Sequence, residues 1–289
     1  MDVSNGVADL HLHTDASDGT CSVADRIEQA RERGLDAIAV TDHDTISEDV
    51  KERVTHPRDV ELIAGVEVRA DVRDTKVELL GYYVDPHSSQ LTSVLERVRR
   101  YRRERNRQIV DRLHDVTSLN RSYEEIRSRA DGILGRPHIA DILVEDGVVD
   151  SVGGAFDRYL GASGAAFVPM ERVPATDVVG AIQDASGIVS LAHPGRIRTI
   201  DVGEIVERLV TDGLDAIEVR YPYAEAPVAD YAGVTVADAA DLAEAFDLLR
   251  TGGSDCHGPG SGKFRVGDVR VPCVNLDALR DRAATRHSL

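Results

Sequence analysis

The chain alternates short apolar runs with longer segments in which apolar residues recur every three or four positions. A short apolar run bounded by turn residues is typical of a buried strand, and the longer period is typical of a helix with one apolar face. The alternation predicts an α/β fold built from repeated strand–helix units. The predicted strands cover residues 8–13, 36–44, 61–67, 76–84, 187–193 and 214–219, and the predicted helices cover residues 22–33, 175–185, 202–211, 237–249 and 274–286.

A different pattern fills the middle of the chain. It is dense in Arg and Glu and predicts one long solvated helix followed by three shorter ones, over residues 97–112, 123–130, 137–146 and 154–160. We therefore expect a helical insertion that acts as a substrate cap. The expected divisions are residues 1–85 and 175–289 for the two parts of the α/β domain and residues 86–174 for the insertion.

The basic run Arg99–Arg103 in this insertion allows two interpretations. It could contact phosphate groups, or it could be a solvated helix face paired with acidic neighbours, which is the interpretation we favour.

The charge balance narrows the possible partners. The 289 residues carry a formal net charge of −17, and only three of the 34 basic residues are lysine. Such acidity disfavours broad electrostatic binding to nucleic acid, so we expect no stable nucleic-acid partner. No apolar run suits a membrane span and no signal-peptide pattern is present. The three cysteines, Cys21, Cys256 and Cys273, are too few and too widely spaced for a disulfide framework, so we expect a cytoplasmic protein.

The first candidate metal ligands of the chain lie on the first predicted strand and in the turn after it. His11 and His13 alternate with Leu10 and Leu12, so both imidazoles project from one face of an extended chain. Asp18 follows in a turn. Two imidazoles and a nearby carboxylate are a common beginning of a Zn, Mn or Fe site, although a pair of buried core histidines is the alternative.

The same residue types return at the ends of later predicted strands. Eight ionisable groups at one edge of successive strand–helix units are difficult to explain by packing, because burying them together is costly unless metal ions neutralise the carboxylates. The set is large enough for two or three divalent ions, with Mn, Zn or Fe favoured over Ca by the mixed ligands. These residues are His11, His13, Asp18, His43, Glu67, His193, Asp255 and His257.

These motifs occur in a familiar order. His11-Leu-His13, Asp18-Gly19, Thr41-Asp-His43-Asp44, Gly65-Val-Glu67, Ala192-His-Pro-Gly195 and Gly253-Ser-Asp-Cys-His257-Gly258, with Leu134-Gly-Arg-Pro-His-Ile-Ala140 in the insertion, resemble the PHP (polymerase and histidinol phosphatase) family. The similarity is greatest to its stand-alone phosphoesterases, which include nucleotide phosphatases and 5′–3′ exoribonucleases.

The resemblance implies a distorted seven-stranded βα barrel with three metal ions at the C-terminal ends of its strands. It implies that Glu67 and His193 share the second ion. The first ion would be held by His11, His13, Glu67 and Asp255, and the third by Asp18, His43 and His257.

One position departs from the family pattern. Where relatives usually have His before Leu-Gly-Tyr, this chain has Glu78. Glu78 either ligates through oxygen, which we favour, or leaves the second metal position weak or empty. The metal stoichiometry, two or three ions, is therefore open.

Several residues are expected to bind a phosphate group of the substrate. Arg136 and His138 resemble the family's substrate-facing residues, although a capping Arg-Pro and a surface histidine are the plain alternative. Arg196 and Lys263 are further phosphate candidates, each with an ordinary loop residue as the alternative. We take Asp255, His257 and His138 as the catalytic group, with His138 able to donate a proton to the leaving group.

The function we expect is hydrolysis of phosphomonoesters by a metal-bound hydroxide. The family resemblance implies nucleotide substrates, either 3′,5′-bisphosphonucleotides or 5′-phosphorylated RNA ends. A histidinol-phosphate phosphatase would use the same metals with a different pocket. A metal-dependent amide hydrolase usually needs a bridging lysine, which neither Lys51 nor Lys76 convincingly supplies. A non-enzymatic metal-stabilised scaffold is disfavoured, because structural zinc sites prefer closed, cysteine-rich ligand sets.

Overall fold

A computed structural model describes residues 6–130, 132–197, 201–223, 234–259 and 264–287. The chain forms two compact units. The barrel unit contains Met1–Leu95 and Val173–Leu289, and the helical unit contains Glu96–Arg172.

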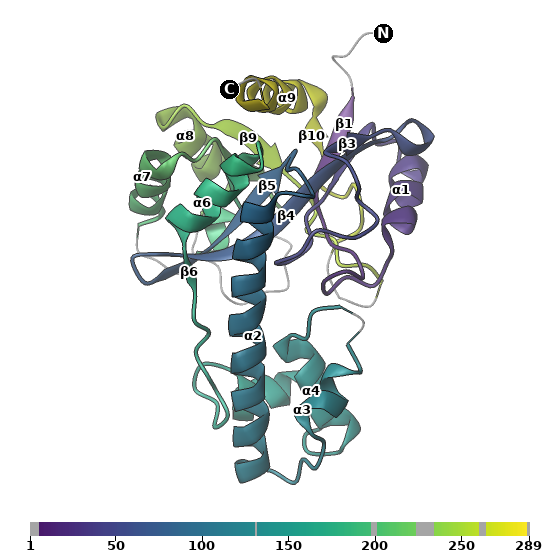
Figure 1. The fold of residues 1–289 in the computed structure, drawn as a ribbon, viewed down its shortest axis with the longest axis vertical. Helices are drawn as coiled ribbons and strands as arrows, with labels where there is room; N and C mark the ends of the chain where they lie inside the picture. The colour runs from purple at the N-terminus through teal and green to yellow at the C-terminus, as the bar shows by residue number, and fades with distance from the viewer. Residues whose placement is uncertain (1–5, 131, 198–200, 224–233, 260–263, 288–289) are drawn as a thin grey trace. The chain divides into compact units, whose positions relative to one another are not determined.

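The barrel unit is built on one strongly curved sheet (Figure 1). Seven strands follow one another around it in the order β1, β2, β4, β5, β7, β8 and β9, and a parallel bridge between Leu12 and Cys256 joins the last to the first. Neighbours along this path are parallel except at β5, which is antiparallel to both β4 and β7. The seven strands are Val7–Leu12, Ala37–Val40, Glu61–Val72, Thr75–Tyr82, Ile188–Leu191, Ala216–Arg220 and Leu249–Gly252.

The expected distorted βα barrel is confirmed, but the number of strands differs. The described sheet has ten strands, because three two-residue strands are added to the path of seven. β10 (Val271–Pro272) pairs with β1, and β3 (Val54–Thr55) and β6 (Val173–Pro174) pair with β4. Such short pairings have no periodic signal in a sequence.

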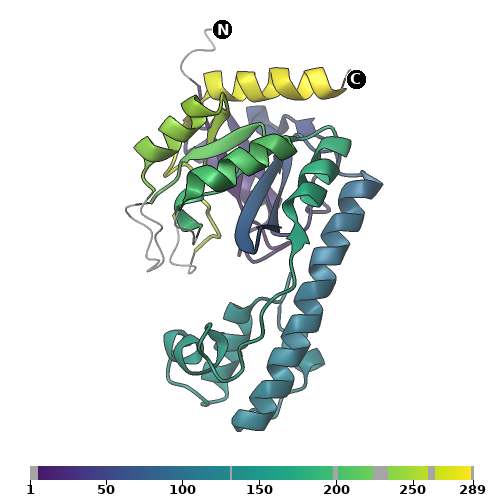
Figure 2. The same cartoon turned by 90° about the vertical axis from the view of Figure 1, so that its left-hand side faces the viewer.

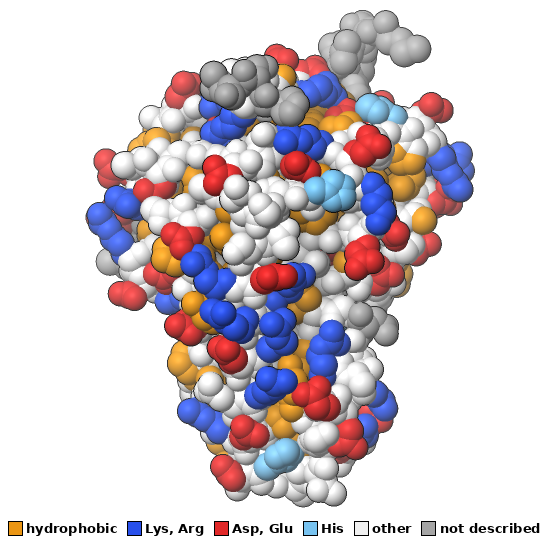
Figure 3. All heavy atoms as spheres, in the orientation of Figure 1, with side chains coloured by type: hydrophobic (Ala, Val, Ile, Leu, Met, Phe, Trp, Pro, Cys, Tyr) orange, Lys and Arg blue, Asp and Glu red, His pale blue; other side chains and the backbone are white. Residues whose placement is uncertain are grey.

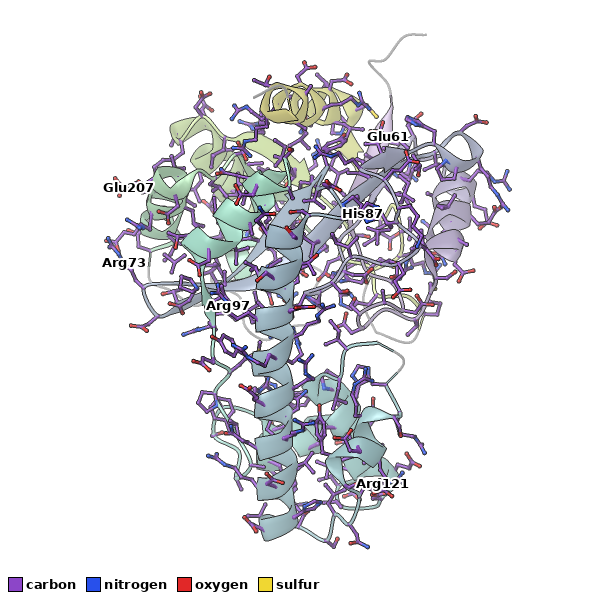
Figure 4. All side chains as sticks on the ribbon, viewed as in Figure 1. Glu61, Arg73, His87, Arg97, Arg121 and Glu207 are labelled. Carbon is purple, nitrogen blue, oxygen red and sulfur yellow. The ribbon has the colours of Figure 1, made fainter. Side chains whose placement is uncertain are left out.

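The hairpin between β4 and β5 determines which residue lies opposite Glu78. Its two-residue turn is Arg73–Asp74, and both residues have positive φ angles, 47° and 68°, as a tight hairpin turn requires. Arg73 lies at its tip (Figure 4). From this turn the register runs back to pair Arg69 directly with Glu78 across the two strands.

Helices lie along the sheet of the barrel unit (Figure 2). α1 begins after Ser22, whose side chain accepts a hydrogen bond from the Asp25 N–H. The Asp25 carboxylate in turn accepts one from the Ser22 N–H, so this reciprocal cap satisfies two free N–H groups. The helices are α1 (Val23–Glu32), α6 (Ala175–Asp184), α7 (Val202–Asp212), α8 (Val236–Ala245) and α9 (Cys273–His287), with 3₁₀ turns η2 (Pro57–Asp59) and η4 (Pro194–Arg196).

One helix ends earlier than expected. The sequence pattern predicted a helix to Leu249, but α8 ends at Ala245. Asp247 has a φ of 52° and turns the chain into β9, which begins at Leu249. The apolar residues Phe246, Leu248 and Leu249 continue the helical spacing by chance.

The helical unit consists of the greater part of α2 and the helices that follow it. α2 runs from Ser89 to Val116, longer at both ends than predicted, and the predicted helix at 154–160 is instead a short α-helix and a π-helical turn. Its core contains Ile109, Leu113, Ile126 and Leu143, each fully or almost fully buried. The remaining elements are α3 (Tyr123–Arg127), α4 (Arg136–Glu145), α5 (Val152–Ala155) and η3 (Phe156–Leu160).

Helices of the described residues are either too short or too polar to cross a membrane. The three cysteines are all free, as the absence of a disulfide framework predicted.

Candidate metal centre

Two isolated backbone bridges bring the candidate site together. The bridge between Leu12 and Cys256 places His11 and His13 beside Asp255 and His257. A second parallel bridge joins His43 directly to Glu67. Four segments distant in the sequence therefore meet at one end of the barrel strands, where βα folds keep their active sites.

Gly253 allows the first of these approaches. A Cβ atom at this position would lie 2.4 Å from both the Cβ and the backbone nitrogen of His11. A side chain at residue 253 would therefore push the Asp255 segment away from the first strand.

The carboxylate of Glu67 lies at the centre of the cluster. Its Oε2 atom is 2.9 Å from His43 Nδ1, 3.4 Å from His13 Nε2 and 3.5 Å from His11 Nε2. Its Oε1 atom is 2.9 Å from His193 Nε2. Glu67 is completely buried, and its one carboxylate lies among four imidazoles.

Asp18 and Asp255 supply the next carboxylates. Asp255 Oδ1 is 3.1 Å from His13 Nε2 and 3.6 Å from His11 Nε2. Asp18 Oδ1 is 3.2 Å from His257 Nε2, and Asp18 Oδ2 is 3.8 Å from His43 Nε2. All eight residues singled out at strand ends in the sequence are therefore gathered in one place.

The donor atoms form overlapping groups whose members lie within 4.8 Å of one another. Several of these atoms are buried and have no hydrogen-bond partner, namely His11 Nε2, both ring nitrogens of His13, Asp18 Oδ1 and Glu67 Oε2. Buried polar atoms normally have a hydrogen-bond partner, so this concentration of unpaired ligand atoms fits the binding of divalent cations. The groups are His13, Asp18, His43 and His257; His11, His13 and Asp255; His11, Glu67 and His193; and His43, Glu67 and Glu78.

The electrostatics of the cluster suit metal ligands. Burial opposes ionisation of Glu67, but His43 and His11 outweigh it and hold the pKa of Glu67 well below its usual range. Burial, reinforced by His257 and His43, lowers the pKa of His13 to about 3. His13 is therefore a neutral imidazole, the form that binds metals.

Glu78 lies at the edge of the cluster, and its two oxygens have different surroundings. Oε1 accepts hydrogen bonds from Arg69 Nε at 3.0 Å and Nη2 at 2.7 Å, and it lies 3.1 Å from Lys76 Nζ. Oε2 is 3.6 Å from His193 Nε2. Burial opposes its ionisation, but Lys76 and Arg69 hold the pKa of Glu78 well below its usual range. Glu78 is thus an ionised carboxylate with one oxygen toward the cluster.

The expected phosphate contacts belong to different units of the chain. Arg196, in the barrel unit, lies beside the cluster: its Nη1 donates to the Tyr221 hydroxyl at 2.8 Å and to Asp255 Oδ2 at 3.3 Å. Arg136 and His138 belong to the helical unit. There Arg136 Nη1 donates to the Leu160 carbonyl at 2.9 Å, and His138 Nδ1 accepts from the Gly135 N–H at 2.9 Å. Their contact with substrate stays a prediction.

The remaining expectations concern isolated residues. Lys263 lies outside the described residues. Cys256 is buried, and His56, His87 and His114, which belong to none of the motifs, are exposed (His87 is labelled in Figure 4).

Sequence reasoning missed a buried glutamate next to the cluster. Glu218 Oε1 lies 2.9 Å from His11 Nδ1, and its Oε2 accepts a hydrogen bond from the His193 backbone N–H at 2.7 Å. A signal for it existed, because Glu218 is the one charged residue within the otherwise apolar run Ala216–Val219. Tyr221, which donates to Asp255 Oδ2 at 3.0 Å, was also missed and had no such signal.

Two candidate ligands have unusual backbone conformations. The φ angle is 24° at His193 and 53° at Asp255. Positive φ is uncommon for residues other than glycine and concentrates at functional sites, where surrounding contacts maintain it.

Comparison with known proteins agrees with this geometry. The family model described as PHP domain matches residues 9–162, more than half of the chain. A 5′–3′ exoribonuclease of Haemophilus influenzae is 33% identical over 259 residues, covering 87% of this chain and 90% of that protein. A 3′,5′-nucleoside bisphosphate phosphatase of Chromobacterium violaceum is 29% identical over 267 residues, covering 90% of each chain.

A solved structure shares the fold along almost the whole chain. It is that of a protein assigned as a metal-dependent phosphoesterase from Bifidobacterium adolescentis, with a TM-score of 0.78, 29% sequence identity and coverage of 95% of this chain and 96% of that one. The present chain therefore belongs to the PHP domain family.

Proposed function

We propose that this protein is a metal-dependent phosphoesterase that hydrolyses phosphate esters of nucleotides. The observation that carries the proposal is the buried group of imidazoles and carboxylates around Glu67, with unpaired donor atoms directed at one another. Relatives named as an exoribonuclease and as a nucleoside bisphosphate phosphatase support a nucleotide as substrate.

The cluster would hold two or three divalent ions. The mixture of imidazole and carboxylate ligands suits Mn, Zn or Fe. Ions bound there supply Lewis acidity for the phosphate oxygens and lower the pKa of water toward neutrality, which is the chemistry that ester hydrolysis needs. The proposed ligands are His11, His13, Asp18, His43, Glu67, Glu78, His193, Asp255 and His257.

The protein's own side chains supply the rest of the chemistry. Arg196 uses one nitrogen on Tyr221 and Asp255, and its planar group has further N–H donors for a phosphate oxygen. His138 is the proposed proton donor to the leaving group, and Arg136 the proposed second phosphate contact. Small phosphorylated molecules are the proposed partners, and the cytoplasmic location stays a prediction.

Release of inorganic phosphate tests the proposal. The panel contains a 3′,5′-bisphosphonucleotide, a nucleoside 5′-monophosphate, a short 5′-phosphorylated RNA and histidinol phosphate, each with Mn²⁺ or with EDTA. We expect release from nucleotide substrates with Mn²⁺, none with EDTA, and none from the Asp255→Ala variant. Equal release with EDTA would contradict the metal-dependent mechanism, and release from histidinol phosphate alone would contradict the nucleotide substrate.

A further inference from the structure

The two units of the chain differ greatly in charge. Residues 96–172 contain fourteen arginines and thirteen aspartates and glutamates, a net charge of +1. The rest of the chain has 20 basic and 38 acidic residues, a net charge of −18. The acidity that disfavours polyanion binding therefore belongs to the barrel unit and not to the helical unit.

The arginines of the helical unit are concentrated on α2. Figure 3 shows Lys and Arg side chains gathered over this helix, and Arg97 is labelled on it in Figure 4. Arg99, Arg102, Arg103 and Asn106 follow the i, i+3, i+4, i+7 spacing that places side chains on one helix face.

This helix face borders a cavity of about 80 Å³ within the helical unit. A water molecule needs only about 10–15 Å³ on this scale, so a group the size of phosphate has enough room. The described residues that line the cavity include four arginines and no carboxylate: Arg99, Arg102, Arg103, Asn106, Tyr123, Arg127, Ile133 and Leu134.

Two polar groups on the cavity wall have no partner among the described residues. Asn106 is 1% exposed, and its Nδ2 donates to the Leu134 carbonyl at 2.7 Å, which leaves Oδ1 as an unpaired acceptor. The Tyr123 hydroxyl is also buried and unpaired. The Arg107 guanidinium lies over the Tyr123 ring, 4.9 Å from its centre, and fixes the ring beside the cavity.

These groups match the chemistry of a nucleotide. Guanidinium N–H groups and the tyrosine hydroxyl donate to phosphate oxygens, while the amide oxygen of Asn106 accepts from a sugar hydroxyl or a base amino group.

We propose that this cavity, the arginine cavity, is a binding site for a phosphate group of the nucleotide substrate, separate from the metal cluster. This proposal adds a second phosphate-binding site to the proposed function. It rests on the proposed function for the identity of the ligand, a nucleotide. It also revises the interpretation of Arg99–Arg103 as a merely solvated face, because three arginines of this run, Arg99, Arg102 and Arg103, line a cavity.

Binding measured without catalysis tests the site. The full-length protein is freed of metal with EDTA, so that no hydrolysis occurs, and a fluorescent 5′-phosphorylated oligoribonucleotide is titrated at low salt with anisotropy as the readout. We expect the double variant Arg99→Gln/Arg103→Gln to raise the dissociation constant at least about tenfold, since each lost contact is charge-assisted. The wild-type affinity should also fall as salt rises, more steeply than that of the variant.

Two further variants keep this test decisive. Arg100→Gln removes the same charge from the same helix outside the cavity lining and should bind nearly as the wild type does. Tyr123→Phe removes only the hydroxyl and should weaken binding without unfolding the unit. Equal weakening by Arg100→Gln, or unchanged binding in both Tyr123→Phe and the double variant, would overturn the proposal.

Competition identifies the source of the phosphate. Displacement by a 3′,5′-bisphosphonucleotide as effectively as by unlabelled RNA indicates a mononucleotide site, and much weaker displacement indicates a strand. No displacement by either, or by inorganic phosphate, would overturn the site. Because the metal cluster is empty in EDTA, failure of this binding leaves the phosphate-release experiment on the cluster unaffected.

Discussion

Glu218 and His11 lie 207 residues apart in the chain, yet Glu218 Oε1 is 2.9 Å from His11 Nδ1. A carboxylate oxygen only accepts, so His11 Nδ1 carries a hydrogen, and Nε2 is the ring nitrogen that would bind a metal ion in exchange for its proton. This Nε2 atom faces Glu67 and Asp255. Glu218 therefore fixes the tautomer of His11 that a metal ion requires.

Replacing Glu218 by Gln should weaken metal binding. Both oxygens of Glu218 accept hydrogen bonds, from His11 Nδ1 and from the His193 N–H, and an amide has only one acceptor for these two donors. We expect affinity for Mn²⁺ to fall by about 10–100-fold, the usual effect of losing a group that orients a ligand. Equilibrium dialysis with elemental analysis measures this. Glu207→Gln, at an exposed position on α7 (Figure 4), is the control, and equal affinities for the two variants would contradict the positioning role.

Replacing Glu78 by Gln distinguishes a ligand from a structural ion pair. If Oε2 ligates, the variant should bind about one metal ion fewer per chain, because a neutral amide is a poor ligand for these ions. Lys76→Met provides the matched control, since it removes a partner of Oε1 and leaves the carboxylate in place. An unchanged number of metal ions per chain in Glu78→Gln would show that Glu78 pairs with Arg69 and Lys76 and is not a metal ligand.

Tyr221→Phe tests how Asp255 is held. The Tyr221 hydroxyl donates to Asp255 Oδ2 at 3.0 Å and accepts from Arg196 Nη1 at 2.8 Å. Losing one hydrogen bond to a charged group costs about 1.5–3 kcal/mol, so metal affinity should fall about tenfold or more. Tyr83→Phe loses a comparable hydrogen bond, to Glu61 at 3.2 Å, at a distance from the candidate ligands. If both variants bind Mn²⁺ equally well, Tyr221 does not position Asp255.

Arg26→Ala should destabilise the barrel. Arg26 is completely buried, and its Nε and Nη2 donate to the His13 carbonyl at 2.9 and 2.7 Å. Nη2 also donates to the Cys256 carbonyl at 3.3 Å. Losing the two hydrogen bonds to the buried His13 carbonyl, together with the one to the Cys256 carbonyl, should lower the free energy of unfolding by about 3 kcal/mol, measured by urea denaturation. The exposed Arg31→Ala should leave it nearly unchanged, and an equally small change for Arg26→Ala would contradict the role.

The sequence predicted the parts of the site that follow local patterns. Alternation placed His11 and His13 on one face, and the ends of apolar strands marked His43, Glu67 and His193. Contacts between residues on different strands could not be predicted from such local patterns. The pairing of Arg69 with Glu78 depends on the register of the β4–β5 hairpin, whose Arg73–Asp74 turn lacks the glycine that usually marks such turns.

The same limit applies to the ends of elements and to the helical unit. α8 ends at Ala245, just before Asp247 adopts a positive φ. The apolar spacing continues past this point, so the sequence pattern does not show where the helix ends. The arginines of α2 look like an ordinary solvated face in sequence, and only the packing of Tyr123 and Arg127 against α2 encloses a cavity.

The central claim is that the cluster around Glu67 binds divalent ions. Anomalous diffraction from crystals soaked in Mn²⁺ tests it most directly, because the signal locates the metal independently of any activity. We predict two or three peaks within coordination distance of His11, His13, Glu67 and Asp255 and their neighbours, with Glu78 beside one of them. No peak at the cluster, or manganese bound only elsewhere on the protein, would contradict the account.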